Sequence, residues 1–110
     1  MTTIRIKDDF TRTPGHRSPD DGPFSGEQFL DEVLRPRFVE AQSRRDKLVV
    51  DLDGTAGYAT SFLEAAFGGL AREFGEDAVL STLDLRCSAE PYLPDEIREY
   101  IKDSRAVANC

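Results

Sequence analysis

The sequence predicts a small α/β domain, with a mixed sheet and helices packed mainly on one face. Apolar residues alternate along the chain between the spacing of strands and the spacing of helices, which implies at least one parallel crossover. The stretch 48–52 is a continuous apolar run with the β-branched pair Val49 and Val50, which is typical of a central strand buried on both sides. A length of 110 residues suits one domain with one core, 1–110.

The first element is a strand over 3–7, in which Ile4 and Ile6 alternate with charged residues. Because it is short and charged, it suits the edge of a sheet. A loop follows over 11–25, where proline and glycine are concentrated. Loops of this length in small domains are often functional or mobile.

A helix is expected to begin at Ser25, because Ser25 to Gln28 matches a capping box. In that motif the hydroxyl accepts a free backbone N–H and the Gln28 side chain reaches back toward the helix start. Pro36 lies inside the helical pattern and removes a backbone hydrogen bond, so a kink or break is expected over 34–36. The apolar stripe of this helix comprises Phe29, Leu30, Val33, Leu34 and Phe38.

The strand 48–52 leads through the turn 53–60 into a helix over 61–74. Gly68 and Gly69 lie inside this helix and each costs roughly 1 kcal/mol relative to alanine, which predicts a compensating close approach of another segment. Its apolar side comprises Phe62, Leu63, Ala66, Phe67, Leu70 and Phe74.

A further strand is expected over 78–86, with Val79, Leu83 and Leu85 on one face. The prolines before residue 95 open a last, short helix. Its apolar stripe comprises Ile97, Tyr100 and Ile101. The tail 104–110 is expected to be flexible.

The composition of the chain narrows the range of functions to be considered. A net charge of -7 speaks against nucleic acid as a partner, since phosphates reward a basic face. Cys87 and Cys110 are too few for a disulfide framework or a zinc site, which favours a reduced, cytoplasmic setting. The apolar runs are too short for a membrane span or a signal peptide, and no motif indicates a cofactor.

The string Asp51-Leu52-Asp53-Gly54-Thr55 resembles the opening motif of haloacid-dehalogenase-like phosphatases. The resemblance implies a nucleophilic aspartate, a second aspartate as acid/base, and magnesium nearby, which makes Asp51 and Asp53 weak metal candidates. Downstream, Ser81, Thr82 and Lys102 are the available partners, and no acidic pair follows a later strand. The alternative is that both aspartates make turn and cap hydrogen bonds at a strand end.

Ser61, preceded by Thr60, also matches a capping box, because Glu64 lies three residues further on. Ser61 is therefore expected to cap the helix. A phosphate there would add about two negative charges where the helix dipole tolerates them. Ser61 and Thr60 are the phosphorylation candidates.

The loop 11–25 offers a candidate anion site formed by Arg17, Ser25 and Glu27. Arg17 and the backbone N–H groups at the start of the Ser25 helix could bind an anion, or Arg17 could pair with Glu27 or Glu64. The first arrangement would make the protein a small-molecule, nucleotide or anion sensor. His16, alone in such a loop, is expected to be exposed.

The stretch 48–70 resembles the strand, turn and serine-bearing helix of STAS domains, the domains of sulfate transporters and anti-sigma-factor antagonists. More closely, three features together resemble a small bacterial STAS-like family of unknown function, DUF4325. They are the Asp9-Phe10 pair, the loop segment 14–29 (PG.R...DGP.SGE.F) and the helix 61–70 (SFLEAAFGGL). The resemblance runs from about Ile4 to Ile101.

It implies a STAS-like fold and a non-enzymatic, regulatory role in protein interaction. In anti-sigma-factor antagonists the phosphorylated serine lies in a D-S-S-G-L string, whose positions fall on 59–63 here. Ser61 takes the modified position, while Ala59 and Phe62 replace the aspartate and the glycine. The implied partner is a histidine-kinase-like ATPase that docks over 57–70, and the oligomeric state is open. The candidate partner-binding residues are Tyr58, Thr60, Ser61, Glu64 and Gly68.

Overall fold

A computed structural model describes residues 2–18 and 20–108, with side chains as far as Lys102. Its centre is a three-stranded sheet in the order β1-β2-β3, with both neighbouring pairs parallel. The strands are β1 (Thr2–Arg5), β2 (Leu48–Asp51) and β3 (Leu83–Arg86). The predicted fold class is confirmed, and so are β1 as an edge strand and β2 as the central one. The strand predicted over 3–7 is wrong at its end, because Ile6 and Lys7 are helical. Within the described residues the sheet is parallel throughout rather than mixed, because helices carry the chain back between successive strands.

The first crossover comprises α1 (Ile6–Asp9), α2 (Gly26–Phe29), the π-helical turn η1 (Leu30–Leu34) and α3 (Arg35–Ser43). Residues 26–43 are helical without interruption, so the break expected at Pro36 is absent. Pro36 lies in the first turn of α3. The irregular helical hydrogen bonding falls in η1, which ends directly before α3 begins. A π-turn changes the backbone hydrogen-bond pattern locally, which lets the helix continue past a residue that has no N–H to donate.

The second crossover comprises α4 (Thr60–Leu63), the π-helical turn η2 (Glu64–Gly68), α5 (Gly69–Phe74) and α6 (Glu76–Thr82). The helix predicted over 61–74 is confirmed and begins one residue earlier. The strand predicted over 78–86 is wrong in its first half, which is α6. Val79 and Leu83 are four residues apart, a spacing that also fits a helix, and Glu76 and Asp77 in the first turn favour one.

Glycines allow close contacts between the two crossovers. A Cβ on Gly26 would lie 2.4 Å from the Phe62 carbonyl oxygen, so α2 and α4 touch backbone to backbone. A Cβ on Gly69 would lie 2.8 Å from the Leu30 side chain. The close approach predicted for the glycine pair of the second crossover is thus confirmed at Gly69, where the neighbour is a side chain.

The last helix, α7 (Leu93–Ala108), is longer than the short helix expected. It covers 104–108 of the predicted flexible tail, and 109–110 lie outside the described residues. α7 closes a single core whose largest side chains are Phe29, Phe38, Phe62 and Phe67.

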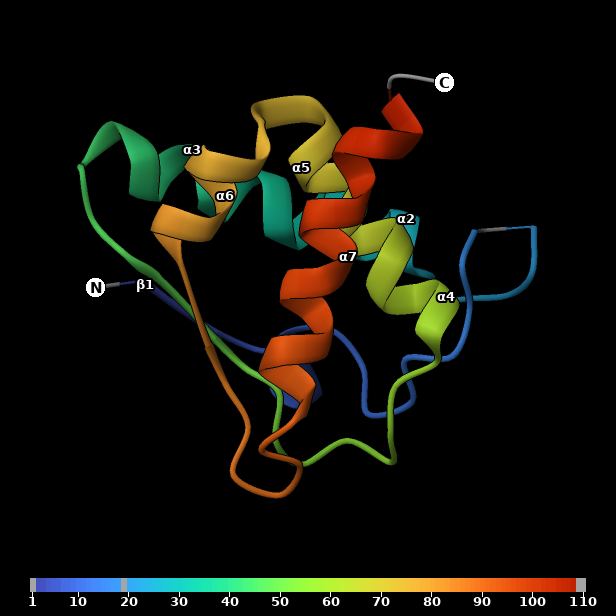
Figure 1. The fold of residues 1–110 in the computed structure, drawn as a ribbon. Helices are drawn as coiled ribbons and strands as arrows, with labels where there is room; N and C mark the ends of the chain where they lie inside the picture. The colour runs from blue at the N-terminus through green and yellow to red at the C-terminus, as the bar shows by residue number, and fades with distance from the viewer. Residues whose placement is uncertain (1, 19, 109–110) are drawn as a thin grey trace.

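The two faces of the sheet differ. Its inner face, toward the helices, carries Ile4, Leu48, Val50, Leu83 and Leu85. Its outer face carries Thr3, Arg5, Val49, Asp51, Asp84 and Arg86. Figure 1 shows the helices gathered on one side of the strands, which confirms the predicted one-sided packing. None of the described helices has both the length and the apolar character needed to cross a membrane.

Candidate functional site

The candidate site lies at the start of α4. Thr60 is exposed and Ser61 is half-buried, both in the first helical turn. The expectation that Ser61 caps this helix is wrong, because Ala59 occupies the N-cap position in an extended conformation. The Ala59 carbonyl accepts hydrogen bonds from the N–H groups of Phe62 and Leu63, at 3.1 and 3.2 Å. Both hydroxyls are therefore presented on the first turn rather than used to close it.

Glu64, one turn further along, is held between two arginines. Arg72 Nη1 donates to Glu64 Oε1 at 2.8 Å, and Arg17 Nη1 donates to Oε2 from the loop 11–25. Burial raises the pKa of the Glu64 carboxyl, but the hydrogen bonds from Arg72 and Arg17 outweigh it and leave the pKa below its ordinary value. Gly68 leaves room for this arrangement, since a Cβ there would lie 3.2 Å from Glu64 Oε1.

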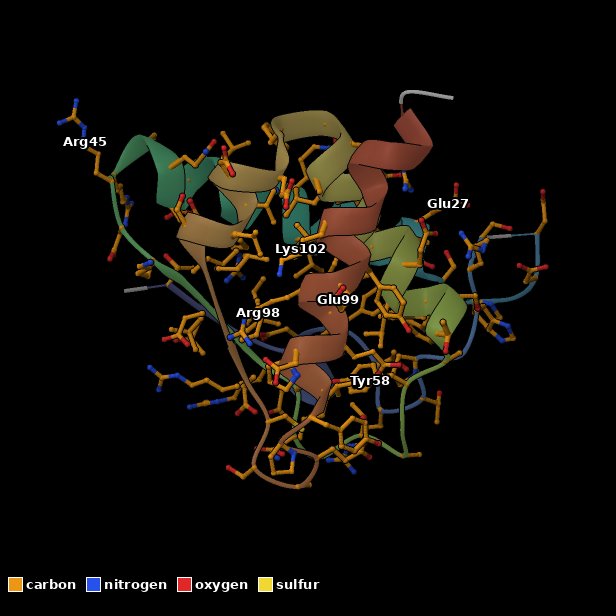
Figure 2. The ribbon with its side chains drawn as sticks, viewed as in Figure 1. Glu27, Arg45, Tyr58, Arg98, Glu99 and Lys102 are labelled. Carbon is orange, nitrogen blue, oxygen red and sulfur yellow. The ribbon has the colours of Figure 1, made fainter. Side chains whose placement is uncertain are left out.

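The loop 11–25 is tied to α2 by its own backbone. The N–H groups of Gly26 and Glu27 donate to the carbonyls of His16 and Arg17, at 2.8 and 3.0 Å. The structure therefore does not bring the predicted anion site together: these N–H groups are occupied, and Arg17 makes its alternative pair with Glu64. The Glu27 side chain is exposed (Figure 2).

Ser25 confirms the predicted cap of the first long helix. Its buried hydroxyl accepts the Gln28 N–H at 3.1 Å. The Gln28 side chain reaches back as expected, but it accepts from the Phe24 N–H, at 3.0 Å, rather than from Ser25. Ser25 is therefore a structural residue in a buried position. His16, expected to be exposed, is half-buried, and a Cβ on Gly22 would touch its ring.

Of the predicted partner-binding residues, Tyr58 is half-buried and Gly68 is buried. The Tyr58 hydroxyl donates to the Leu52 carbonyl at 2.8 Å, and burial raises its pKa above the ordinary value. Gly68 is buried beside Glu64. Of the five residues predicted, Thr60 is exposed, while Ser61 and Glu64 are half-buried. The accessible part of 57–70 is thus concentrated at the beginning of the helical segment.

Helix α7 contributes Tyr100, a neighbour of Thr60 that the sequence did not reveal. The Tyr100 hydroxyl donates to Glu96 Oε1 at 2.9 Å. Burial raises the pKa of Tyr100, while a hydrogen bond with the Thr60 side chain acts in the opposite direction. In the sequence, Tyr100 is one member of an apolar helical stripe, and that pattern gives no sign that its hydroxyl meets Thr60.

Asp51 and Asp53 make turn and cap hydrogen bonds. Asp51 Oδ1 accepts the Asp53 N–H at 3.0 Å, and the Asp53 carboxylate accepts the N–H groups of Ser88 and Ala89, each at 2.9 Å. The bonds from Ala89 and Ser88 lower the pKa of Asp53. The described side chains include no group of three or more His, Cys, Asp or Glu residues placed to hold a metal ion.

The other residues considered for phosphatase chemistry lie elsewhere. Ser81 and Thr82 precede β3 at the amino end of the parallel sheet, whereas Asp51 and Asp53 lie at its carboxyl end. The Lys102 side chain lies on the exposed surface of α7 (Figure 2). The structure does not bring these residues to the two aspartates.

Comparison with known proteins places the chain in a family. The family described as STAS-like domain of unknown function (DUF4325) matches residues 25–92. This segment contains the capped helix of Ser25, strands β2 and β3, and the start of α4. No curated protein and no solved structure matches the chain. The resemblance seen in the sequence is confirmed, and the chain belongs to the STAS-like DUF4325 family.

Proposed function

We propose that the chain is a regulatory module that binds a protein partner through the start of α4, and that phosphorylation of Ser61 or Thr60 switches this binding. The observation that carries the proposal is the placement of exposed Thr60 and half-buried Ser61 in the helical turn that precedes the ion pairs of Glu64. We further propose a histidine-kinase-like ATPase as the partner, which rests on the wider likeness to anti-sigma-factor antagonists. The module needs no catalytic residue for this role.

The chemistry of the switch follows from charge. Ser61 lies three residues before Glu64, so both side chains are on one side of the helix. A phosphate adds about 1.5 to 2 negative charges and three acceptor oxygens. It would repel Glu64 and compete for Arg17, whose side chain is 48% exposed and comes from the loop 11–25. Phosphorylation would therefore change both the charge of the docking surface and the contact that ties the loop to the helix.

The sensor and phosphatase alternatives receive no such support. The first needs Arg17 and the α2 N–H groups, which are engaged within the fold. The second needs Asp51 and Asp53, which make turn and loop hydrogen bonds.

The test is a pull-down from cells that naturally make the protein, with wild-type, Ser61→Ala and Ser61→Asp baits. We expect a protein that the wild type and Ser61→Ala retain and that Ser61→Asp loses. Ser43→Asp is the matched control, because it adds the same charge to an exposed serine on α3. Mass spectrometry of the native protein should find phosphate on Ser61 or Thr60. If Ser61→Asp retains every partner that the wild type retains, the switch is excluded.

A further inference from the structure

A hollow of about 340 Å³ lies between the end of α3 and the end of α6, at the amino end of the sheet. Cavities of this volume fall within the range that holds small molecules in proteins. The hollow lies at the opposite end of β2 from the turn that leads into α4. We call it the α3–α6 hollow, and its lining comprises Gln42, Arg45, Asp46, Lys47, Ser81 and Thr82.

Thr82 brings a buried hydroxyl to the α3–α6 hollow. The residue is 9% exposed, and its hydroxyl makes no hydrogen bond with another described residue. Every fully buried side-chain oxygen or nitrogen among the described residues has a partner, so this hydroxyl is open to the hollow that Thr82 lines. Ser81 differs, because its hydroxyl donates to the Ala78 carbonyl at 3.1 Å. A ligand in the hollow would give the Thr82 hydroxyl the partner that the fold does not supply.

The carbonyl groups at the two helix ends are engaged within the fold. At the end of α3, the Asp46 N–H donates to the Ala41 carbonyl at 2.9 Å. At the end of α6, Lys47 Nζ donates to the Ser81 carbonyl. These bonds use acceptors that helix ends otherwise present to a cation. The groups that remain open at the hollow are therefore mainly donors.

The charges at the α3–α6 hollow favour an anion. Arg45 makes no ion pair with the described side chains and extends into solvent (Figure 2). Lys47 keeps two of its three N–H groups, because its bond to the Ser81 carbonyl uses one. The Asp46 carboxylate accepts the Lys47 backbone N–H at 2.8 Å, which lowers its pKa. Two cations and one carboxylate give the lining a net charge of +1, whereas the whole chain has -7.

Arg45 occupies a backbone position that favours glycine. It follows the end of α3 with a φ of 53°, in the left-handed region. Phe24 is the other described residue that has a positive φ without being glycine. Glycine is the usual residue directly after a helix that ends in this way. The chain thus keeps a long basic side chain at the hollow against the preference of its backbone.

We propose that the α3–α6 hollow binds the phosphate group of a small soluble ligand, which is either inorganic phosphate or a phosphate ester. The acceptor oxygens of a phosphate suit a site with several donors, here the Thr82 hydroxyl, the Lys47 ammonium and the Arg45 guanidinium. The Gln42 amide adds a neutral donor. A carboxylate has only two oxygens and would leave some of these donors unused. The site is separate from the loop 11–25 and does not depend on phosphorylation of α4.

NMR titrations of the ¹⁵N-labelled protein with inorganic phosphate and with glycerol 3-phosphate test the proposal. We expect saturable shifts of the backbone signals of Lys47, Ser81 and Thr82, and no saturable shifts with chloride at the same ionic strength. Tighter binding of glycerol 3-phosphate would identify the ligand as an ester, whereas equal or tighter binding of inorganic phosphate would identify it as free phosphate. Lack of saturation with both compounds would overturn the proposal.

Matched variants locate the bound phosphate. Arg45→Gln should weaken binding by about threefold. Arg44→Gln removes the same charge from the neighbouring exposed residue, which does not line the hollow, and should weaken binding by less than about twofold. Thr82→Val should weaken binding by about tenfold, while Thr82→Ser keeps the hydroxyl and should stay within about twofold of the wild type.

Equal effects of the two arginine variants would overturn the proposal, because binding would then follow the general charge of the surface. Wild-type affinity in Thr82→Val would overturn it as well. Arg45→Gly separates binding from folding, since glycine suits the backbone at this position. This variant should unfold at the same temperature as the wild type or at a higher one, and it should still bind phosphate more weakly.

Discussion

Glu64 links the loop 11–25 to the helical segment 60–74 through its ion pair with Arg17, and it also pairs with Arg72 within that segment. Its pKa is lowered below the ordinary 4.5, so its ionised form stabilises the fold. This contribution is fully present above the unfolded pKa and is lost as the pH falls through the folded one. Glu64→Gln should lower the free energy of unfolding by up to about 1 kcal/mol near neutral pH, because the pair is partly exposed. Urea unfolding should show that the difference in the free energy of unfolding between wild type and Glu64→Gln is present near neutral pH and disappears at acidic pH.

Glu27→Gln is the control for that experiment. Glu27 is exposed on α2 and makes no ion pair with the described side chains (Figure 2). Its replacement should leave the free energy of unfolding within about 0.5 kcal/mol of the wild type. If Glu64→Gln lowers the free energy of unfolding equally at neutral and acidic pH, the carboxylate acts through packing rather than charge.

Gly26 makes a close backbone contact between the two crossovers. Gly26→Ala would place a methyl group 2.4 Å from the Phe62 carbonyl oxygen. Alanine is the better helix former, but overpacking of this kind costs about 1 to 3 kcal/mol and should prevail. Gly15→Ala is the control, since the nearest atom to its Cβ is the Thr13 carbonyl oxygen at 3.9 Å. Chemical denaturation should show a clear loss in the free energy of unfolding for Gly26→Ala but not for Gly15→Ala. Equal stabilities of the two variants would mean that α2 and α4 shift apart easily.

At the scale of the elements, Asp53 joins the turn after β2 to the loop after β3. Its pKa is lowered by the N–H groups of Ala89 and Ser88, so the link is present above the ordinary 3.8 and is lost in acid. Asp53→Ala should make the amides of Ser88 and Ala89 exchange faster at neutral pH, because their acceptor is removed. Asp8→Ala, at an exposed position on α1, is the control. Unchanged exchange at both amides would mean that the loop holds its shape without Asp53.

Element boundaries show what a sequence pattern can and cannot decide. Ser25 and Ser61 have the same capping pattern, yet only Ser25 caps its helix. The pattern does not say which residue of a Thr-Ser pair begins the helix, because the burial of Phe62 and Leu63 sets the position of the turn. The strand predicted over 78–86 was wrong in its first half for a related reason. Its apolar spacing suits both periods, and Gly75, with a φ of 98°, separates α5 from a new helix rather than from a strand.

At the scale of the whole molecule, the sequence predicted the α/β class, the central β2 and the one-sided helix layer, because these follow from hydrophobic periodicity. It did not reveal the meeting of Thr60 with Tyr100. That contact joins segments that are distant in the chain, and a local pattern carries no information about it. The candidate site therefore depends on tertiary contacts between distant segments, whereas the fold class could be predicted from the local hydrophobic pattern.

The family match spans 25–92, but the core extends beyond it on both sides. β1 and α1 supply Ile4 and Ile6, and α7 supplies Leu93, Ile97 and Ile101, all at most 3% exposed. Burial of such side chains contributes about 1.5 to 3 kcal/mol each, so their loss removes about 7 to 15 kcal/mol. That is as large as the whole stability of a typical domain. A fragment 25–92 should therefore lack cooperative thermal unfolding and NMR dispersion, which 1–110 should show, and a folded fragment would mean that β1 and α7 are dispensable.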